Sequence, residues 1–175
     1  ALGWLAASGS FNQSQAQEPR AKTPEAASRS ADGSMPPAAD PQRPVVRVGM
    51  IGLDTSHVVA FTRALNQPNN TGDLAGVKIV AAFPGGNESF PLSRDRVKGF
   101  TEQVRELGVE IVDSIEALLP KVDVVLLESV DGREHLAQVE PVFKARKPVC
   151  SDKPLAHNLA DAWKIQTLGK KYGTP

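Results

Sequence analysis

The polar residues that can do chemistry fall into three short clusters, and each cluster directly follows an apolar run. The first cluster is Gly52–His57, the second is Glu128–His135, and the third is Ser151–Pro154. Each apolar run predicts a strand that is buried in a parallel sheet. Because the carboxyl ends of parallel strands meet at one edge of the sheet, we expect the three clusters to line one ligand-binding crevice.

The first cluster has the order of a phosphate-binding turn. The apolar run that begins at Val45 predicts a strand, two glycines punctuate its end, and a helical pattern follows at once. In an open parallel sheet, the first strand-to-helix turn is the usual cradle for a nucleotide phosphate. We therefore predict that this turn binds a cofactor. The candidate binding residues in this stretch are Gly49, Gly52, Asp54, Thr55, Ser56 and His57.

An alternation of strands and helices must position these clusters. Buried strands are predicted at about 45–48, 77–83, 109–112, 122–127 and 148–151. Helices are predicted at about 56–66, 93–107, 115–119, 133–146 and 158–172. Asn158 followed by Asp161 resembles a capping box at the start of the last helix, and Gly173 is placed to end it. The alternation predicts an α/β domain with a doubly wound parallel sheet.

Composition argues against nucleic acid as a partner. The chain has 20 Lys and Arg residues against 20 Asp and Glu residues, so it offers no basic excess to a phosphate backbone. Aromatic residues, on which bases stack, make up only 5% of the chain. The one cysteine, Cys150, cannot form an internal disulfide, and its apolar setting predicts a buried strand residue.

The first 44 residues have the composition of an export signal and a linker. The apolar segment 1–7, with Ser14 and Ala16 as small residues at signal-peptidase positions, predicts the remnant of a secretory signal over 1–16. This segment is too short for a membrane span. The Pro-, Ala- and Ser-rich segment 17–44 predicts a disordered linker. We therefore expect a folded domain over 45–175 in a periplasmic or otherwise exported protein, with a cytoplasmic location as the alternative.

Three sequence runs resemble one known family. VRVGMIG, VDVVLLESVDGREH and KPVCSDKPLAHNLADA are similar to the N-terminal domain of the Gfo/Idh/MocA oxidoreductases, which include glucose–fructose oxidoreductase and inositol dehydrogenase. The resemblance covers about residues 45–173. Its most specific part is Asp152-Lys153-Pro154, where the family has Glu-Lys-Pro after the fifth strand, and His135 matches a histidine shortly after the fourth. The resemblance implies a Rossmann-like, nucleotide-binding fold.

The resemblance also implies an oxidoreductase that uses NAD or NADP on a small sugar, polyol or related hydroxyl compound. It implies that Lys153 reaches the substrate hydroxyl and the nicotinamide ribose, that Asp152 orients this lysine, and that His135 is catalytic. From the residues alone, Lys153 could instead be a solvated loop lysine and His135 a structural histidine. The predicted cofactor-binding set is completed by Glu128, Asp152, Lys153 and Pro154.

The glycine fingerprint of a dinucleotide-binding turn, G-x-G-x-x-G, is only partly present. Gly52 holds the first position, but Asp54 and His57 replace the second and third glycines. An aspartate there adds bulk and negative charge beside a phosphate unless its side chain turns away to cap the helix. A histidine at the third position would widen the contact between strand and helix, or point into the cleft.

The sequence leaves the choice between NAD and NADP open. The end of the predicted second strand, Phe83-Pro84, lacks the acidic residue that binds an adenosine ribose, and the nearest acid is Glu88. Arg94 and Arg96 could meet the 2′-phosphate of NADP, or they could form a solvated helix face.

Members of this family carry a C-terminal α/β domain that shapes the substrate pocket. This chain stops at Pro175, two residues after the last predicted helix. We therefore expect the chain to be the nucleotide-binding half alone, to be inactive by itself, and to form any homo-oligomer through the second domain.

A non-redox binding module on the same fold is the alternative function. In such a module the altered turn would hold a ligand other than a dinucleotide. Asp54, His57 and His135 could gather a metal ion, but three ligands from two loops make a weak pattern, so we predict no metal site. A domain that only packs against a partner domain is a third possibility.

Overall fold

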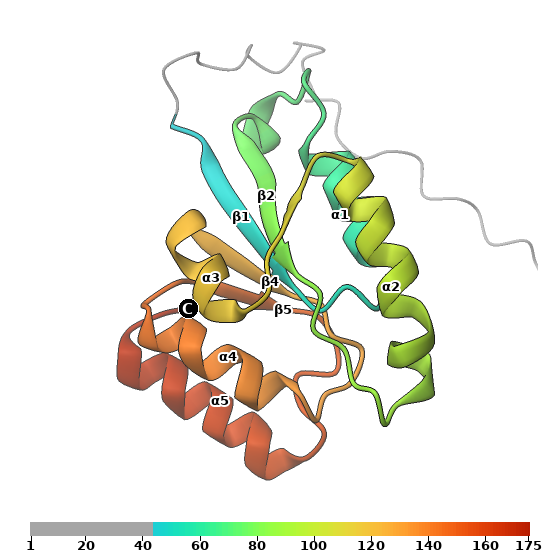
Figure 1. Cartoon of the computed structure of the whole chain (residues 1–175). Helices are drawn as coiled ribbons and strands as arrows, with labels where there is room; N and C mark the ends of the chain where they lie inside the picture. The colour runs from blue at the N-terminus through green and yellow to red at the C-terminus, as the bar shows by residue number, and fades with distance from the viewer. Residues whose placement is uncertain (1–43) are drawn as a thin grey trace, which may run out of the picture. The chain divides into compact units, whose positions relative to one another are not determined.

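Five parallel strands form one sheet at the centre of the described part of the chain (Figure 1). This computed structural model describes residues 44–175, so the predicted signal remnant and all but the last residue of the predicted linker lie outside it. In the sheet order β3-β2-β1-β4-β5, every neighbouring pair is parallel, which confirms the predicted doubly wound α/β fold. The strands are β1 (Val46–Ile51), β2 (Val77–Phe83), β3 (Glu110–Ile111), β4 (Val124–Leu127) and β5 (Val149–Ser151).

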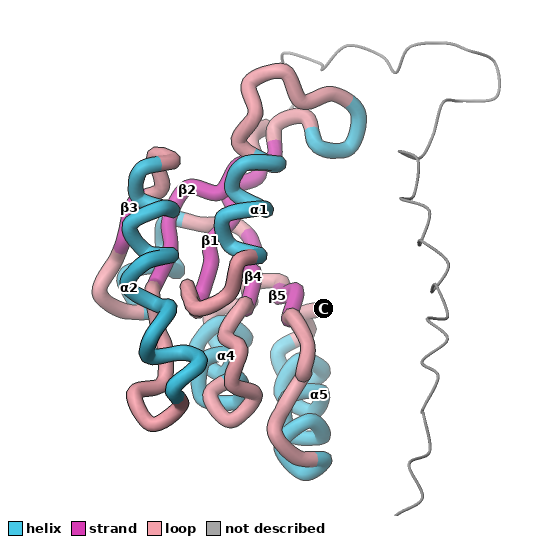
Figure 2. Tube along the Cα trace, turned by 90° about the vertical axis from the view of Figure 1, so that its right-hand side faces the viewer, coloured by secondary structure: helices cyan, strands magenta, loops and turns pink. Residues whose placement is uncertain are grey.

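Helices cover both faces of this sheet (Figure 2). The helices α1 and α2 pack on one face, and α3, α4 and α5 pack on the other. No helix within 44–175 has both the length and the apolar character needed to cross a lipid bilayer. The α-helices are α1 (His57–Leu65), α2 (Pro91–Glu106), α3 (Ile115–Leu118), α4 (His135–Lys144) and α5 (Leu159–Tyr172), and the short 3₁₀ helices are η1 (Gly72–Leu74) and η2 (Leu119–Lys121).

The hydrophobic core consists of two layers, one on each side of the sheet. Met50 belongs to the layer under α1 and α2, and its neighbour Ile51 belongs to the layer under α3, α4 and α5. Both side chains are fully buried because successive residues of a strand point to opposite faces. The buried part of the central strand β1, residues 48–51, therefore has no polar side chain, as expected for a parallel strand that is covered on both faces.

The ends of α5 follow the sequence signals directly. The side chain of Asn158 accepts a 2.9 Å hydrogen bond from the N–H of Asp161, as a helix N-cap does. Gly173 closes the helix with φ +66°, in the left-handed region that suits glycine. The predicted cap at Asn158 and the glycine stop are both confirmed, although Asp161 returns its bond to the side-chain amide of Asn158 and not to the backbone N–H of a capping box.

The predicted burial of Cys150 is wrong. Cys150 lies in β5 at the edge of the sheet, and its side chain is exposed. It lines an open groove of about 400 Å³ between α1 and the neighbouring face of β4 and β5. An apolar run thus located the strand correctly, but burial also depends on whether another element covers that face.

Candidate functional site

The ends of three adjacent strands place the three polar clusters side by side. Ile51 of β1 is in register with Leu127 of β4, and Leu127 is in register with Ser151 of β5. The residues that directly follow β1, β4 and β5 are therefore Gly52, Glu128 and Asp152, respectively. The expectation that these strands end at one edge of the sheet is confirmed, and this edge forms the candidate site.

Protein atoms pack closely around the first glycine of the turn. Gly52 has φ +87°, and its N–H donates to the carbonyl oxygen of Phe83 at 3.0 Å. A Cβ added at Gly52 would lie only 2.2 Å from Oγ of Ser129 and 2.4 Å from its backbone nitrogen. Glycine is therefore required here by backbone conformation and by the loop after β4.

Gly49, a predicted cofactor-binding residue, packs against the hydrophobic core. It lies inside β1, two residues before the strand ends, and not in the turn. A Cβ at this position would lie 3.0 Å from Cγ1 of Val122 and 3.2 Å from Cδ1 of Leu118. Gly49 therefore makes room for side chains of the core, and its part in cofactor binding stays a prediction.

Asp54 is turned into the protein and does not cap α1. Its side chain is almost fully buried, with 1% of its surface exposed. Its Oδ1 accepts from the N–H of Val130 at 3.0 Å, and its Oδ2 accepts from Oγ of Ser93 at 2.6 Å. This carboxylate ties the turn to the loop after β4 and to α2, so it occupies the second glycine position for a structural reason.

The other polar residues of the turn lie at the start of α1. Thr55 is buried, and its Oγ1 accepts from the N–H of His57 at 3.4 Å. Ser56 is exposed and holds the N-cap position without a side-chain cap bond. Thr55 therefore satisfies the N–H of the first residue of α1, a role that the sequence also allowed for Asp54.

His57 joins the first cluster to the other two. Its Nδ1 lies 2.7 Å from Oδ2 of Asp152 and 3.9 Å from Oε2 of Glu128. The imidazole is 40% exposed and packs beside the ring of Phe61, one helical turn along α1, with 5.8 Å between ring centroids. The histidine at the third glycine position thus points towards the carboxylates at the ends of β4 and β5.

The pKa values of the two carboxylates in this cluster, Glu128 and Asp152, shift in opposite directions. Burial, together with the negative charge of Asp152, raises the pKa of Glu128 to about 7, although His57 and Lys153 oppose the shift. Burial also acts on Asp152, but hydrogen bonds from the Lys153 N–H and from His57 outweigh it and lower the pKa of Asp152. Near neutral pH the site therefore holds one ionised carboxylate beside one that readily binds a proton.

Lys153 and Pro154 follow directly at the end of β5. The backbone N–H of Lys153 donates to Oδ1 of Asp152 at 2.8 Å, and the peptide bond to Pro154 is cis. The Lys153 side chain is exposed, and its positive charge opposes the rise in the pKa of Glu128. Lys153 is therefore at the same edge of the sheet as Gly52, with its ammonium group available to a ligand.

His135 occupies a structural position. It is fully buried at the start of α4, with Nε2 2.6 Å from the carbonyl oxygen of Ser129 and Nδ1 3.1 Å from that of Leu155. The ring thereby links the loop after β4 to the loop after β5. This placement favours the structural alternative over a catalytic role, because both ring nitrogens face backbone carbonyls.

Some residues that shape the site were not singled out from the sequence. Ser93 and Ser129 hold the turn from outside it, and Asp131 accepts hydrogen bonds from Arg133 and from Asn87 in the loop after β2. Only the Asp-Gly dipeptide at 131–132 carries a local turn signal. The bonds of Ser93 to Asp54 and of Asn87 to Asp131 join residues 39 and 44 positions apart, and no periodic pattern reports such pairs.

The arginines considered for a 2′-phosphate lie on α2. Nε of Arg94 donates to Oδ1 of the adjacent Asp95 at 2.8 Å, and Arg94 is 47% exposed. Arg96 is exposed as well. The ion pair of Arg94 with its exposed neighbour Asp95 agrees with the second interpretation of these arginines, a solvated helix face.

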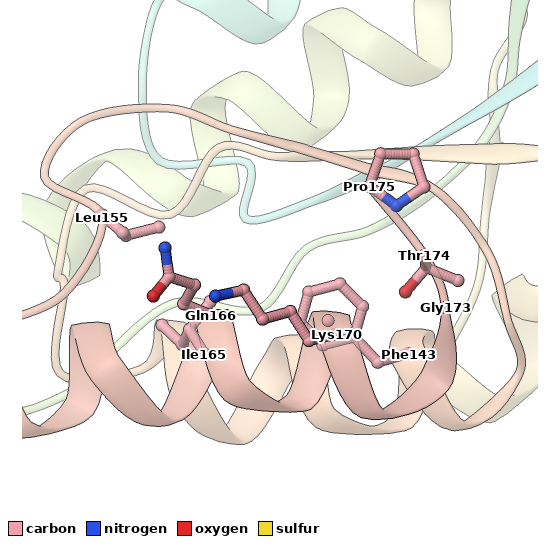
Figure 3. A pocket seen from close by; sticks show the side chains of 9 residues that line it. Phe143, Leu155, Ile165, Gln166, Lys170, Gly173, Thr174 and Pro175 are labelled. Carbon is pink, nitrogen blue, oxygen red and sulfur yellow. The ribbon is translucent and has the colours of Figure 1, made fainter.

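A second pocket, of about 480 Å³, lies beside α5 and includes Leu155, the residue directly after the third cluster (Figure 3). Ile165, Gln166 and Lys170 of α5 line it together with Leu155 and Pro175. None of the predicted site residues lines this pocket. The pocket therefore offers a second place for a small molecule and provides a contrast for binding experiments.

Comparisons with known proteins agree with this architecture. Residues 46–175 match the family model GFO_IDH_MocA, described as an oxidoreductase family with an NAD-binding Rossmann fold. The search of curated proteins finds no match. Several solved structures are similar to the chain.

A dehydrogenase (MviM) from Clostridium difficile has 24% sequence identity and a TM-score of 0.53, with 74% of this chain and 37% of that chain covered. A biliverdin reductase from Synechocystis sp. PCC 6803, solved with biliverdin and NADP+, has 25% identity and a TM-score of 0.52, with coverage of 74% and 36%. KijD10, a 3-ketoreductase from Actinomadura kijaniata solved with NADP and TDP-benzene, has 25% identity and a TM-score of 0.50, with coverage of 74% and 35%. The chain thus spans just over a third of the length of these proteins.

Proposed function

Because this chain belongs to the Gfo/Idh/MocA oxidoreductase family, with its NAD-binding Rossmann fold, we propose that it is the nucleotide-binding part of an NAD- or NADP-dependent oxidoreductase. The proposed substrate is a sugar, polyol or related small hydroxyl compound. The observation that carries this proposal is the position of Lys153 at the end of β5, on the same edge of the sheet as Gly52 at the end of β1.

The turn after β1 is compatible with a dinucleotide. The sequence raised a conflict between the charge of Asp54 and a phosphate, but this carboxylate is buried and both of its oxygens accept hydrogen bonds from the protein. Its oxygens therefore do not face a ligand at the surface of the turn. We propose that the backbone of 52–57 holds the diphosphate, while Lys153 and Pro154 lie towards the nicotinamide end.

When bound, the cofactor supplies or accepts the hydride. We propose that the ammonium group of Lys153 faces the substrate oxygen, where its positive charge stabilises the negative charge that develops as hydride leaves the carbon. Asp152 accepts from the Lys153 N–H and thereby fixes the backbone from which this side chain extends. The lysine is thus held at the strand end before a substrate arrives.

Calorimetric titration with NAD+, NADH, NADP+ and NADPH tests the proposal. We expect saturable binding of at least one dinucleotide at one site per chain, and Lys153→Met should weaken this binding by much less than it lowers kcat. In the full-length protein, Lys153→Met should lower kcat by at least about 100-fold, because the substitution removes a group that stabilises the transition state. The absence of heat with all four dinucleotides would contradict the proposal.

A non-redox binding module remains the second candidate, because Asp54 and His57 stand at two glycine positions of the fingerprint. In that case the native chain should bind no dinucleotide. The double variant Asp54→Gly, His57→Gly would then gain dinucleotide binding that the native chain lacks. If the native chain binds a dinucleotide, this second candidate is excluded.

Two further proposals concern the protein's surroundings. We propose that the protein is exported, on the signal-like segment 1–16, with a cytoplasmic location as the alternative. We also propose that any homo-oligomer forms through a C-terminal domain of the kind that the family carries. Cell fractionation with a periplasmic marker tests the first proposal, and sedimentation of the chain with and without such a domain tests the second.

A further inference from the structure

We propose that His57, Glu128 and Asp152 form a binding site for one divalent transition-metal ion. The three side chains come from the ends of β1, β4 and β5, and their candidate ligand atoms all lie within 4.8 Å of one another. The site lies at the same three strand ends as the proposed dinucleotide site, and it adds a metal ion that the turn and Lys153 do not need in order to bind a cofactor.

The strongest support for this proposal is an unsatisfied buried oxygen. Oε2 of Glu128 is buried and has no hydrogen-bond partner among residues 44–175, in a side chain that is only 3% exposed. It faces the cluster, with Nδ1 of His57 at 3.9 Å. A buried carboxylate oxygen without a partner is costly, and buried acids are normally paired or bound to a metal. A cation between these side chains would supply the missing partner.

The distances suit a shared ion. Nitrogen and oxygen ligands lie about 2.0–2.2 Å from Zn²⁺, so two ligands of one ion are at most about 4.4 Å apart. Nδ1 of His57 is 2.7 Å from Oδ2 of Asp152 and 3.9 Å from Oε2 of Glu128. The imidazole is 40% exposed and has room to turn, so small side-chain movements bring all three ligands to one ion.

The surroundings leave coordination positions open. Glu128 and Asp152 also line the groove of about 400 Å³ beside α1, which connects the carboxylates to solvent. Three protein ligands with open positions are typical of metal sites that bind water or a substrate, whereas closed structural sites have four protein ligands. The predicted site would therefore hold an exchangeable ion that a ligand oxygen can reach.

The ligand set indicates which metals would bind. One imidazole nitrogen favours Zn²⁺ and similar ions over Mg²⁺ and Ca²⁺, while two carboxylates also suit Mn²⁺. Cys150 lines the same groove, but its sulfur is not among the clustered ligand atoms. The set also differs from the one considered in the sequence, because Asp54 and His135 bind to other protein groups.

Titration of the chain with Mn²⁺ alone and Zn²⁺ alone tests this proposal. Calorimetry should give one ion per chain, and electron paramagnetic resonance should show the free Mn²⁺ signal decreasing to the same stoichiometry. Pulsed spectra should contain coupling to one imidazole nitrogen. The chain has three histidines, of which His135 is buried and bonded, so this coupling should disappear in His57→Gln.

Substitutions of the three ligands provide the decisive comparison. Glu128→Gln, Asp152→Asn and His57→Gln should each weaken metal binding at least about 10-fold, since even loss of a group behind a ligand costs 10- to 100-fold. His157→Gln and Glu140→Gln, which change a histidine and a glutamate outside the cluster, should bind as the native chain does. Circular dichroism and melting curves identify any variant that fails to fold.

Two results would overturn the proposal. One is the absence of Mn²⁺ and Zn²⁺ binding below about 1 mM, which is a weaker affinity than a three-ligand site should have. The other is unchanged metal binding in all three folded ligand variants. Neither experiment contains a dinucleotide, so failure of the metal site leaves the cofactor titration, and the function it tests, unaffected.

Discussion

At the scale of single residues, the site depends on side chains that replace glycines. Asp54 stands where a dinucleotide-binding turn has its second glycine, yet it is buried and holds Val130 and Ser93. His57 stands at the third position and contacts Asp152. The substitutions that make the fingerprint weak are therefore the residues that connect the turn to its neighbours.

Restoring glycine at position 54 should destabilise the fold. Asp54→Gly would leave the N–H of Val130 and the hydroxyl of Ser93 without their acceptor, and each buried polar group left unpaired costs about 1–3 kcal/mol. We expect the free energy of unfolding to fall by about 2–4 kcal/mol in urea denaturation. Asp54→Asn keeps one acceptor and should lose less. A glycine variant as stable as the native chain would show that these bonds contribute nothing.

Asp131 should make stability depend on pH. Hydrogen bonds from Arg133, together with one from Asn87, lower the pKa of Asp131 from its ordinary value of 3.8 to about 2. Burial of the carboxylate opposes this shift but does not outweigh the hydrogen bonds. Glu134 is a further acid at this place, and its Oε1 also accepts from Nδ2 of Asn87. Because the folded pKa is lowered, the stabilisation is complete above about pH 4 and is lost as the pH falls towards 2.

Urea denaturation of the native chain and Asp131→Asn between about pH 2 and pH 5 measures this effect. The difference in unfolding free energy should be largest at the upper end of this range and should shrink as acid protonates Asp131. A difference that stays constant over the range would mean that Arg133 does not lower the pKa of Asp131.

At the scale of elements, the chain could be predicted well where local signals act and poorly where they do not. The order of strands and helices, the cap at Asn158 and the stop at Gly173 follow from periodicity and turn chemistry. The partners of Asp54 lie 39 and 76 residues away, so no window of sequence reveals them. The same holds for His57, whose contact with Asp152 spans 95 residues.

The cap of α5 should contribute measurably to stability. Asn158→Ala removes the oxygen that accepts from the N–H of Asp161, and loss of an N-cap typically costs about 1 kcal/mol. Asn158→Ser provides another capping oxygen and should restore most of this energy. Thermal unfolding compares the three proteins, and equal melting temperatures for the alanine variant and the native chain would argue against the cap.

Two glycine substitutions should have opposite effects. A Cβ at Gly132 would lie 2.8 Å from the carbonyl carbon of Ala156 and 2.9 Å from the nitrogen of His157, so Gly132→Ala must push the loops after β4 and β5 apart. Gly99 lies in α2 with open space around it, so Gly99→Ala should stabilise the chain by up to about 1 kcal/mol. We expect the first variant to unfold at lower urea concentration than the native chain and the second at higher. The opposite order would contradict the packing of the two loops.

At the scale of the whole molecule, the described part of the chain is a Rossmann-like domain of an oxidoreductase family. Its sheet order brings the ends of β1, β4 and β5 together, and this was predictable because strand–helix alternation restricts the topology. The substrate was not predictable in the same way. The chain spans little more than a third of its structural neighbours, and the groups that select a substrate are not defined by this sheet edge alone.

Amide NMR during titration with NADP(H) and NAD(H) shows whether these three strand ends form one dinucleotide site. We expect the amide signals of 52–57, 128–132 and 152–153 to shift together along one binding curve. Shifts confined to the pocket beside α5, or no shifts with any of the four dinucleotides, would contradict it.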